Sequence, residues 1–494
     1  MRNVARLAEF TPTSRERYVD LLRVASLTVV ILGHWLMAVI LIGGDGTIQV
    51  TNVLMVIPSI QPVTWVLQVM PIFFMVGGFS HATALASLRR RGGGYSEFVR
   101  SRVDRLLRPT IVFAGVWLAV SLCCEASGFG SATVLFAARA VAQPLWFVGV
   151  YLGIVAFAPV MELAHRRLGR WAPALPAALG LAACAVDTVR LGLGMPAAGY
   201  LNVALVWLAI HQIGFFYADG TLVRGGRRLA AMLAGTGFAA TVALTTVGPY
   251  PVSMVGMPGE RVSNMSPPTV ALLTQAVGLI GVVLLLRAPA SRWLARRRVW
   301  TAVIAANGLT MTAFLWHLSA LLVVTWVTAH PGGTLREVGS VRWWLFRPLW
   351  LAVLAAVTAG FILVFRRADQ HGATGPGRLL ATGTEGGRWR TALASSGTAL
   401  CAVGVLGFST VGFGGILAGR TATLVVLPVT PLRSTALLCA GLAVLTATRW
   451  RSGASAPVAG RQGTSAPVAG RPGASAPVAG RSGTPVGIVG AVDG

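Results

Sequence analysis

The sequence predicts an all-α protein that crosses a membrane many times. Of its 494 residues, 55% are hydrophobic and only 11% are charged, which is less than half the charged fraction of an average soluble domain. Apolar stretches of about 20 residues recur along the chain, and each can cross a hydrocarbon core about 30 Å thick. Arginine clusters separate these stretches. A signal peptide would explain one such stretch but not ten.

Apolar length, broken at Gly, Pro and Arg, predicts a ten-span core followed by one or two appended spans. The core spans are expected at 19–41, 63–86, 109–127, 145–164, 172–192, 200–218, 228–246, 269–287, 301–327 and 343–366. The appended spans are expected within 391–448, at 391–414 and 432–448.

The remaining segments define the domain organisation. The core domain covers 15–366, after a short N-terminal segment, 1–14, and before a linker rich in Gly, Thr and Arg over 367–390. Near the C-terminus the chain repeats ten residues, as RSGASAPVAG, RQGTSAPVAG and RPGASAPVAG. These repeats contain too few large apolar side chains to build a core, so 449–494 is predicted to be a disordered tail.

The arginine clusters predict the orientation of the chain. Every second loop is rich in arginine: the clusters include Arg15 and Arg17, Arg89 to Arg91, Arg166 and Arg167, Arg224 to Arg228, Arg296 to Arg298, and Arg366 and Arg367. The positive-inside rule therefore places the N-terminus in the cytoplasm, with the protein in the plasma membrane. Charges spread over separate loops do not indicate a nucleic-acid partner. The cysteines lack metal-ligand spacing, so neither a metal nor a bound cofactor is expected.

The first span contains the most informative pair of polar residues. In RERYVDLLRVASLTVVILGHWL, Arg23 and His34 are eleven positions apart, about three helical turns, so both side chains share one helix face. The rise between them is about 16 Å, which places the arginine near the cytoplasmic end and the imidazole near the middle of the bilayer. Arginine binds phosphates through paired hydrogen bonds, and a neutral imidazole accepts a proton from a hydroxyl. The alternative is a snorkelling arginine and a histidine that bonds to a neighbouring helix.

Other polar residues are expected in the membrane interior. His211 and His317 fall near the middle of their spans, and Asn307 precedes His317 in sequence. Together they predict a polar cavity, although each histidine taken singly is better explained as a residue that joins helices by a hydrogen bond than as a catalyst. Asp187 is a buried carboxylate that either orients a histidine or pairs with Arg190. His81 lies toward the cytoplasmic end of the second span, and the sequence predicts only a packing role for it.

Arg102 and Arg105, in SRVDRLLRP, are three residues apart before the third span. On a helix they would lie on one side of its cytoplasmic entrance, where they complete a phosphate site begun by Arg23. The alternative is that they are ordinary positive-inside charges.

These motifs resemble the acyltransferase 3 family of bacterial membrane-bound acyltransferases over about residues 15 to 366. The resemblance rests on VDLLRVASLTVVILGHW, MPIFFMVGGFS, RVDR, PLWFVGVYL and LWHLSALL, in that order, and on LVWLAIHQIGFF and YPVSMVGMPG for an actinobacterial type. The second span reads GGF where many members have SGF, and 367–494 has no counterpart in the family.

The resemblance implies an O-acyltransferase with acyl-CoA, in particular acetyl-CoA, as co-substrate. The acceptor would be a hydroxyl of a glycan, a lipid-linked sugar or a secondary metabolite. His34 would be the catalytic histidine, Arg23 its motif partner, and Arg102 and Arg105 donor-binding residues. The alternative function is a proton-coupled transporter or lipid flippase, in which the histidines relay protons and the arginines recognise an anion.

Overall fold

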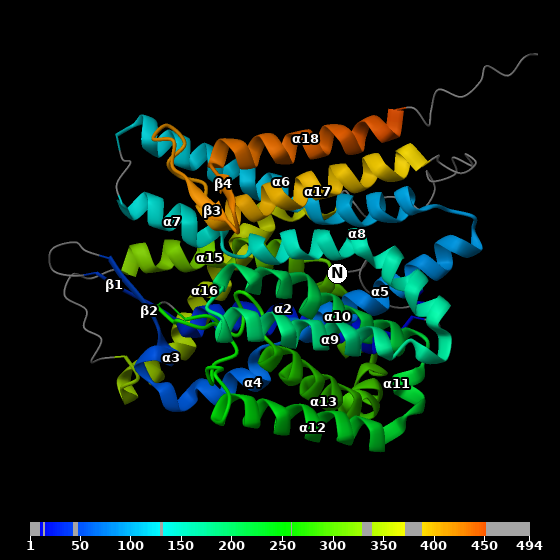
Figure 1. The fold of residues 1–494 in the computed structure, drawn as a ribbon. Coiled ribbons are helices and arrows are strands. Elements are labelled where there is room, and N and C mark those ends of the chain that lie inside the picture. Colours follow the sequence, from blue (N-terminus) through cyan, green and yellow to red (C-terminus); the bar gives the residue numbers. More distant parts are fainter. Residues whose placement is uncertain are drawn as a thin grey trace, which may run out of the picture. The chain divides into compact units, whose positions relative to one another are not determined.

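The computed structural model describes residues 10–12, 15–42, 48–128, 132–257, 259–328, 338–370 and 388–450. Over these residues the chain is a helical bundle with two short β-hairpins (Figure 1). Within the described part, eleven helices are long and apolar enough to cross a membrane, and the apolar helix Pro431–Ala447 is shorter. The prediction of a polytopic all-α membrane protein is confirmed.

The helices and strands follow one another with short connections. The first half contains α2 (Arg17–Met37), β1 (Ala38–Ile42), β2 (Ile48–Asn52), α3 (Val53–Val56), η1 (Pro58–Val63), α4 (Thr64–Leu67), α5 (Met70–Arg90), α6 (Tyr95–Ala126), α7 (Ala132–Ala142), α8 (Leu145–Leu168), η2 (Gly169–Trp171), α9 (Ala174–Asp187), η3 (Thr188–Gly192), η4 (Pro196–Tyr200) and α10 (Leu201–Ala218). The second half contains α11 (Thr221–Arg224), α12 (Gly226–Thr246), α13 (Val270–Leu294), α14 (Arg297–Asn307), α15 (Thr310–Thr328), α16 (Val341–Gln370), α17 (Arg388–Val411), β3 (Ala422–Leu424), β4 (Leu427–Val429) and α18 (Pro431–Trp450).

Three span boundaries differ from the sequence prediction. The first span ends at Met37, because the next five residues form β1, which pairs with β2 in antiparallel register. The expected span 301–327 is two helices, α14 and α15, with a break at Gly308 and Leu309. Helix α6 begins at Tyr95, well before the apolar stretch, because the preceding polar residues continue the same helix. Arg102 and Arg105 therefore lie on a helix.

Close contact between α5 and α10 depends on two glycines. A Cβ atom at Gly78 would lie 1.9 Å from the His211 carbonyl oxygen, and one at Gly214 would lie 2.1 Å from the Met75 carbonyl oxygen. Small residues allow membrane helices to approach backbone to backbone. This contact places His81 of α5 beside His211 of α10.

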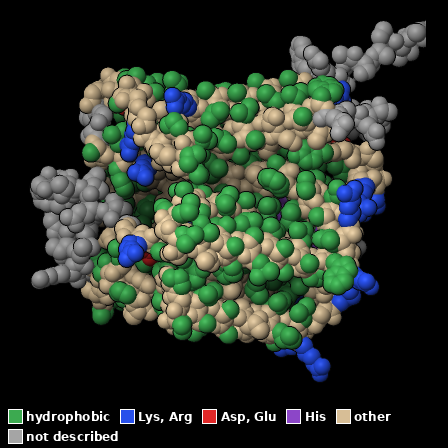
Figure 2. Space-filling view, in the orientation of Figure 1, with side chains coloured by type: hydrophobic (Ala, Val, Ile, Leu, Met, Phe, Trp, Pro, Cys, Tyr) green, Lys and Arg blue, Asp and Glu red, His purple; other side chains and the backbone are tan. Residues whose placement is uncertain are grey.

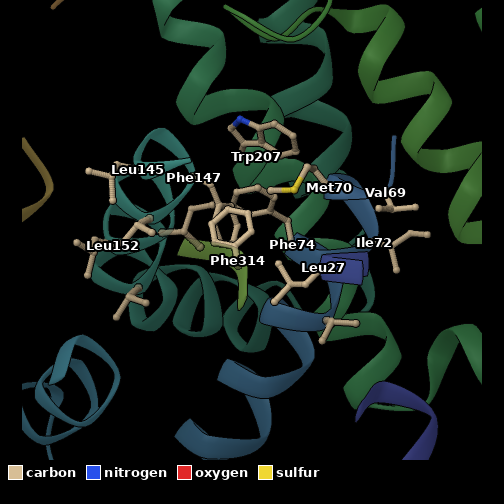
Figure 3. Close-up of a cluster of buried hydrophobic side chains, with 14 of the residues drawn as sticks. Leu27, Val69, Met70, Ile72, Phe74, Leu145, Phe147, Leu152, Trp207 and Phe314 are labelled. Atoms are coloured by element: carbon tan, nitrogen blue, oxygen red, sulfur yellow. The ribbon is translucent and has the colours of Figure 1, made fainter. Parts of the chain in front are cut away.

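Aromatic side chains from four helices fill the centre of the bundle. Phe74 of α5 stacks on Trp207 of α10 with ring centroids 4.3 Å apart, and Phe147 of α8 meets Phe314 of α15 at 5.3 Å. All four rings are buried, and Figure 3 shows them converging with Leu27 of α2. This packing fixes the relative positions of the helices that carry the polar residues described below.

The appended helices α17 and α18 pack against the core. Cys401, Val405 and Phe408 of α17 belong to the same buried hydrophobic cluster as the core helices. At the end of α6 the Glu125 carboxylate accepts hydrogen bonds from the backbone N–H groups of three successive residues after α17: Gly415, Ile416 and Leu417. Most of the predicted linker and almost all of the predicted tail lie outside the described residues.

The surface of the described chain suits a lipid environment. Figure 2 shows hydrophobic side chains over most of this face, with arginines toward its edges. Many large apolar side chains are exposed, among them Leu181, Val247, Leu286 and Leu363. Helices suit a lipid environment because each one satisfies its own backbone polar groups. Apolar side chains that face outward suit it because they contact the lipid chains.

Candidate functional site

Arg23 is held in place by two neighbours near the N-terminal end of α2. Its Nη1 donates to Asp20 Oδ1 at 3.1 Å, and its Nη2 donates to Ser80 Oγ of α5 at 2.8 Å. Asp20 also accepts from Arg15 Nε at 2.7 Å and from Asn307 Nδ2 at 3.3 Å. Asn307, expected in the interior cavity, therefore belongs to this polar cluster instead. The Asp20 carboxylate is shared, and its charge cannot neutralise both arginines.

Arg102 and Arg105 add two charges to the same region. Tyr151 of α8 interacts electrostatically with Arg23, Arg102 and Arg105, and these arginines also interact with one another, so the three guanidinium groups lie in one region of the bundle. The described residues provide no salt bridge for Arg102 or Arg105, and the Arg102 Nε atom is buried without a hydrogen-bond partner. Guanidinium groups gathered around unfilled hydrogen-bonding capacity form a site for an anion.

His81 and His211 form a buried pair beside the three arginines. His81 Nδ1 lies 3.0 Å from His211 Nε2, and the Tyr151 hydroxyl lies 3.4 Å from His81 Nε2. Both imidazoles are at most 1% exposed. His211 Nδ1 is buried and has no partner among the described residues. His211 therefore pairs with His81, for which the sequence predicts only a packing role.

His34 and His317 form a second pair farther along α2. His34 Nδ1 lies 2.7 Å from His317 Nε2, and the rings are nearly parallel, with an angle of 8° between them. His317 Nδ1 lies 2.5 Å from the Phe314 carbonyl oxygen, and Trp35 Nε1 donates to the His317 carbonyl oxygen at 3.0 Å. The imidazole of His317 is buried and that of His34 is half-buried.

The hydrogen bonds of this pair determine which nitrogen carries each proton. A carbonyl oxygen only accepts, so His317 Nδ1 carries hydrogen and donates to Phe314. Neutral His317 then has a lone pair on Nε2, which accepts from His34 Nδ1–H. The remaining His34 nitrogen, Nε2, has a lone pair and makes no hydrogen bond to a described residue. The pair thus presents one unoccupied basic nitrogen.

Asp187 lies in a separate polar cluster. Its carboxylate accepts from Asn202 Nδ2 at 2.8 Å, from the Tyr250 hydroxyl at 3.1 Å and from the Val270 backbone N–H at 2.9 Å. Burial, together with the charge of Asp187, raises the pKa of the Tyr250 hydroxyl, which therefore remains a donor. Arg190 donates to the Pro267 carbonyl oxygen. Asp187 thus joins α9, α10 and α13, and none of its recorded hydrogen bonds involves a histidine.

The glycine at position 77, where many members of the resembled family have serine, is explained by its neighbour Tyr151. A Cβ atom at Gly77, the first residue of GGF, would lie 2.9 Å from both the hydroxyl oxygen and the Cε2 atom of Tyr151. The tyrosine ring therefore occupies the space that a side chain at this position would need. Sequence reasoning did not select Tyr151, because the contact joins two helices and only GGF in place of SGF signalled an unusual neighbour.

The fold and these polar clusters define a membrane-embedded helical protein with a buried histidine pair and a basic site. The family model for the acyltransferase domain of the acyltransferase 3 family matches residues 16–366, well over half of the chain. The chain belongs to this family and is a membrane acyltransferase. No curated protein and no solved structure matches it closely enough to count as similar.

Proposed function

We propose that this protein transfers an acyl group, in particular acetyl, from acyl-CoA to a hydroxyl of a glycan, a lipid-linked sugar or a secondary metabolite. The observation that supports this most strongly is the hydrogen-bond chain from Phe314 through His317 to His34. It leaves the lone pair of His34 Nε2 directed away from its partner, as a general base requires.

His34 Nε2 acts as the base in the proposed transfer. Nε2 takes the proton of the acceptor hydroxyl while that oxygen attacks the thioester carbon. The carbon–sulfur bond breaks, and the coenzyme A thiolate takes the proton back from Nε2. The same lone pair also serves the alternative route, in which Nε2 attacks the thioester to give an acyl-imidazole that the acceptor oxygen then opens. Both routes release one coenzyme A for each ester formed.

The donor phosphates are assigned to Arg23, Arg102 and Arg105. These arginines all interact electrostatically with Tyr151, and α2 runs unbroken from Arg23 to His34. Eleven positions on a helix span about 16 Å. Coenzyme A, whose phosphates and thiol are joined by an extended arm, suits two sites separated in this way.

The orientation follows from the source of the donor. Acyl-CoA is a cytoplasmic metabolite, so the arginine site and the N-terminus of α2 are placed on the cytoplasmic side of the plasma membrane. The arginine-rich loops support the same orientation. Cysteines introduced in the loop between α5 and α6 should be labelled by a membrane-impermeant thiol reagent only after the cells are opened.

Label transfer tests the proposed function. Membranes containing the protein receive acetyl-CoA labelled in the acetyl group, together with candidate glycan and metabolite acceptors. We expect acceptor-dependent ester formation matched by an equal release of free coenzyme A. A transporter would instead show flux of solute across proteoliposomes without consumption of coenzyme A, and that result would contradict the proposal.

A further inference from the structure

Tyr151 has a position that only a glycine opposite it permits. Its ring lies against Gly77 of α5, where any Cβ atom would be 2.9 Å from the hydroxyl oxygen. The hydroxyl is thereby brought next to His81, where it interacts electrostatically with the three arginines. A large polar side chain held this closely against a helix backbone has a restricted set of positions.

The two histidines behind Tyr151 determine the direction of its hydroxyl proton. One arrangement has Tyr151 donating to His81 and His81 donating to His211, which leaves His211 Nδ1 as a buried N–H without an acceptor. The reverse arrangement has His211 donating to His81 and His81 donating to the Tyr151 oxygen. His211 Nδ1 then has only an unused lone pair. Buried N–H groups without acceptors are rarer than acceptors left unused, so the reverse arrangement is favoured.

In the favoured arrangement Tyr151 accepts a hydrogen bond from His81 and does not donate its own proton to either histidine. The hydroxyl oxygen is occupied by His81 Nε2–H, and the O–H bond is free to donate elsewhere. Arg23, Arg102 and Arg105 are the charged groups that interact with this hydroxyl. These are all hydrogen-bond donors, and none of them accepts a proton. An anion bound among the arginines would supply the acceptor that Tyr151 lacks.

We propose that Tyr151, held by His81 and His211, is a phosphate-binding residue of the donor site. It donates its hydroxyl proton to a phosphate oxygen of acyl-CoA that the three arginines also bind. This inference rests on the proposed function for the identity of the anion, and it adds one neutral, directed donor to a site of diffuse positive charge. Arg102 Nε, buried without a partner, supplies a second unfilled donor in the same place.

The test is a binding measurement on the purified full-length protein, with coenzyme A as the probe and pantetheine, which lacks the phosphates, as its comparison. Tyr151→Phe removes one hydroxyl and keeps the ring against Gly77. We expect it to weaken coenzyme A binding about tenfold, since a hydrogen bond to a charged group contributes at least this much. Pantetheine binding should stay unchanged.

The matched control is Tyr95→Phe, which removes a hydroxyl that bonds to the Ala156 carbonyl and to Ser395 outside the arginine site. It should bind coenzyme A as the wild type does. Unchanged coenzyme A binding by Tyr151→Phe would overturn the inference. Equal weakening of coenzyme A and pantetheine would also overturn it, because the hydroxyl would then act on something other than the phosphates.

The binding assay separates this inference from the proposed function. If Tyr151→Phe selectively weakens coenzyme A binding while the wild type transfers no acyl group, the phosphate site stands and the proposed acyl transfer fails. If acyl transfer occurs but Tyr151→Phe binds coenzyme A normally, the role of Tyr151 fails alone.

Discussion

The two histidine pairs have similar nitrogen-to-nitrogen distances but opposite chemical consequences. In each pair a nitrogen of one imidazole lies within 3.0 Å of a nitrogen of the other. The difference lies in the second nitrogen of His317 and of His211, the one that faces away from the paired imidazole. His317 Nδ1 donates a hydrogen bond to the Phe314 carbonyl oxygen, whereas His211 Nδ1 has no hydrogen-bond partner among the described residues. The first pair therefore ends in a lone pair on His34, and the second ends in a hydroxyl proton on Tyr151.

A backbone carbonyl can thus determine the role of an imidazole one hydrogen bond away. His34 becomes a base because its partner must donate to Phe314. Tyr151 becomes a donor because His211, at the end of its hydrogen-bond chain, has no carbonyl to satisfy. Substitutions at the two pairs should thus affect different steps: the first pair the turnover number, and the second pair the binding of the donor.

The largest effect among the supporting residues is expected at His317. His317→Ala leaves His34 Nδ1–H without its acceptor, so the imidazole loses its tautomer and orientation. We expect kcat to fall about 10- to 100-fold, as for other residues that orient an imidazole, with KM for acyl-CoA unchanged. Initial rates over a range of acyl-CoA concentrations measure both constants.

His317→Gln provides the conservative comparison. The glutamine carbonyl oxygen can accept from His34 Nδ1–H, so kcat should recover in part relative to His317→Ala. If the two variants are equally slow, or if KM rises while kcat is unchanged, His317 does not position His34.

Gly77→Ser should have the next largest effect, on the second pair. The new side chain collides with Tyr151 and displaces its hydroxyl, so KM for acyl-CoA should rise about tenfold. Gly153→Ser on α8 is the matched control, because a Cβ atom there meets no atom within 4 Å. Wild-type KM in Gly77→Ser would refute the steric argument.

The smallest effect is expected at His211, three hydrogen bonds from the anion. His211→Leu leaves Tyr151 in place but removes the group that sets its direction, so coenzyme A binding should weaken about two- to fivefold. In a Tyr151→Phe background the same substitution should have no further effect on binding. A further two- to fivefold loss of coenzyme A affinity in that background would show that His211 acts independently of Tyr151.

The sequence predicted the spans well because hydropathy and length are local properties. The Arg23 and His34 pair was also predictable, since α2 is an unbroken helix and spacing alone places both on one face. The break between α14 and α15, and the strand after α2, interrupt apolar sequence and carry no strong local signal.

The partners of the polar residues were not predictable. His34 and His317 are 283 positions apart, and His81 and His211 are 130 apart, so their pairing depends on how the helices pack. Asp187 illustrates the same limit: Arg190 was a reasonable local partner, but its hydrogen bonds come from Asn202, Tyr250 and Val270. Backbone contact at Gly78 and Gly214 brings the second histidine pair together, and spacing within one helix cannot reveal it.

The central claim is that the free lone pair of His34 performs the transfer. It is tested most directly by the rate of labelled acetyl transfer, with coenzyme A release, in membranes containing equal amounts of wild type, His34→Ala or His165→Ala. His165, which bonds to Gln212 and Asp219, is the matched histidine outside the site. We predict that the transfer rate of His34→Ala is about 10²- to 10⁴-fold lower than that of the wild type, while His165→Ala transfers acetyl at the wild-type rate. Full transfer by His34→Ala would contradict the account.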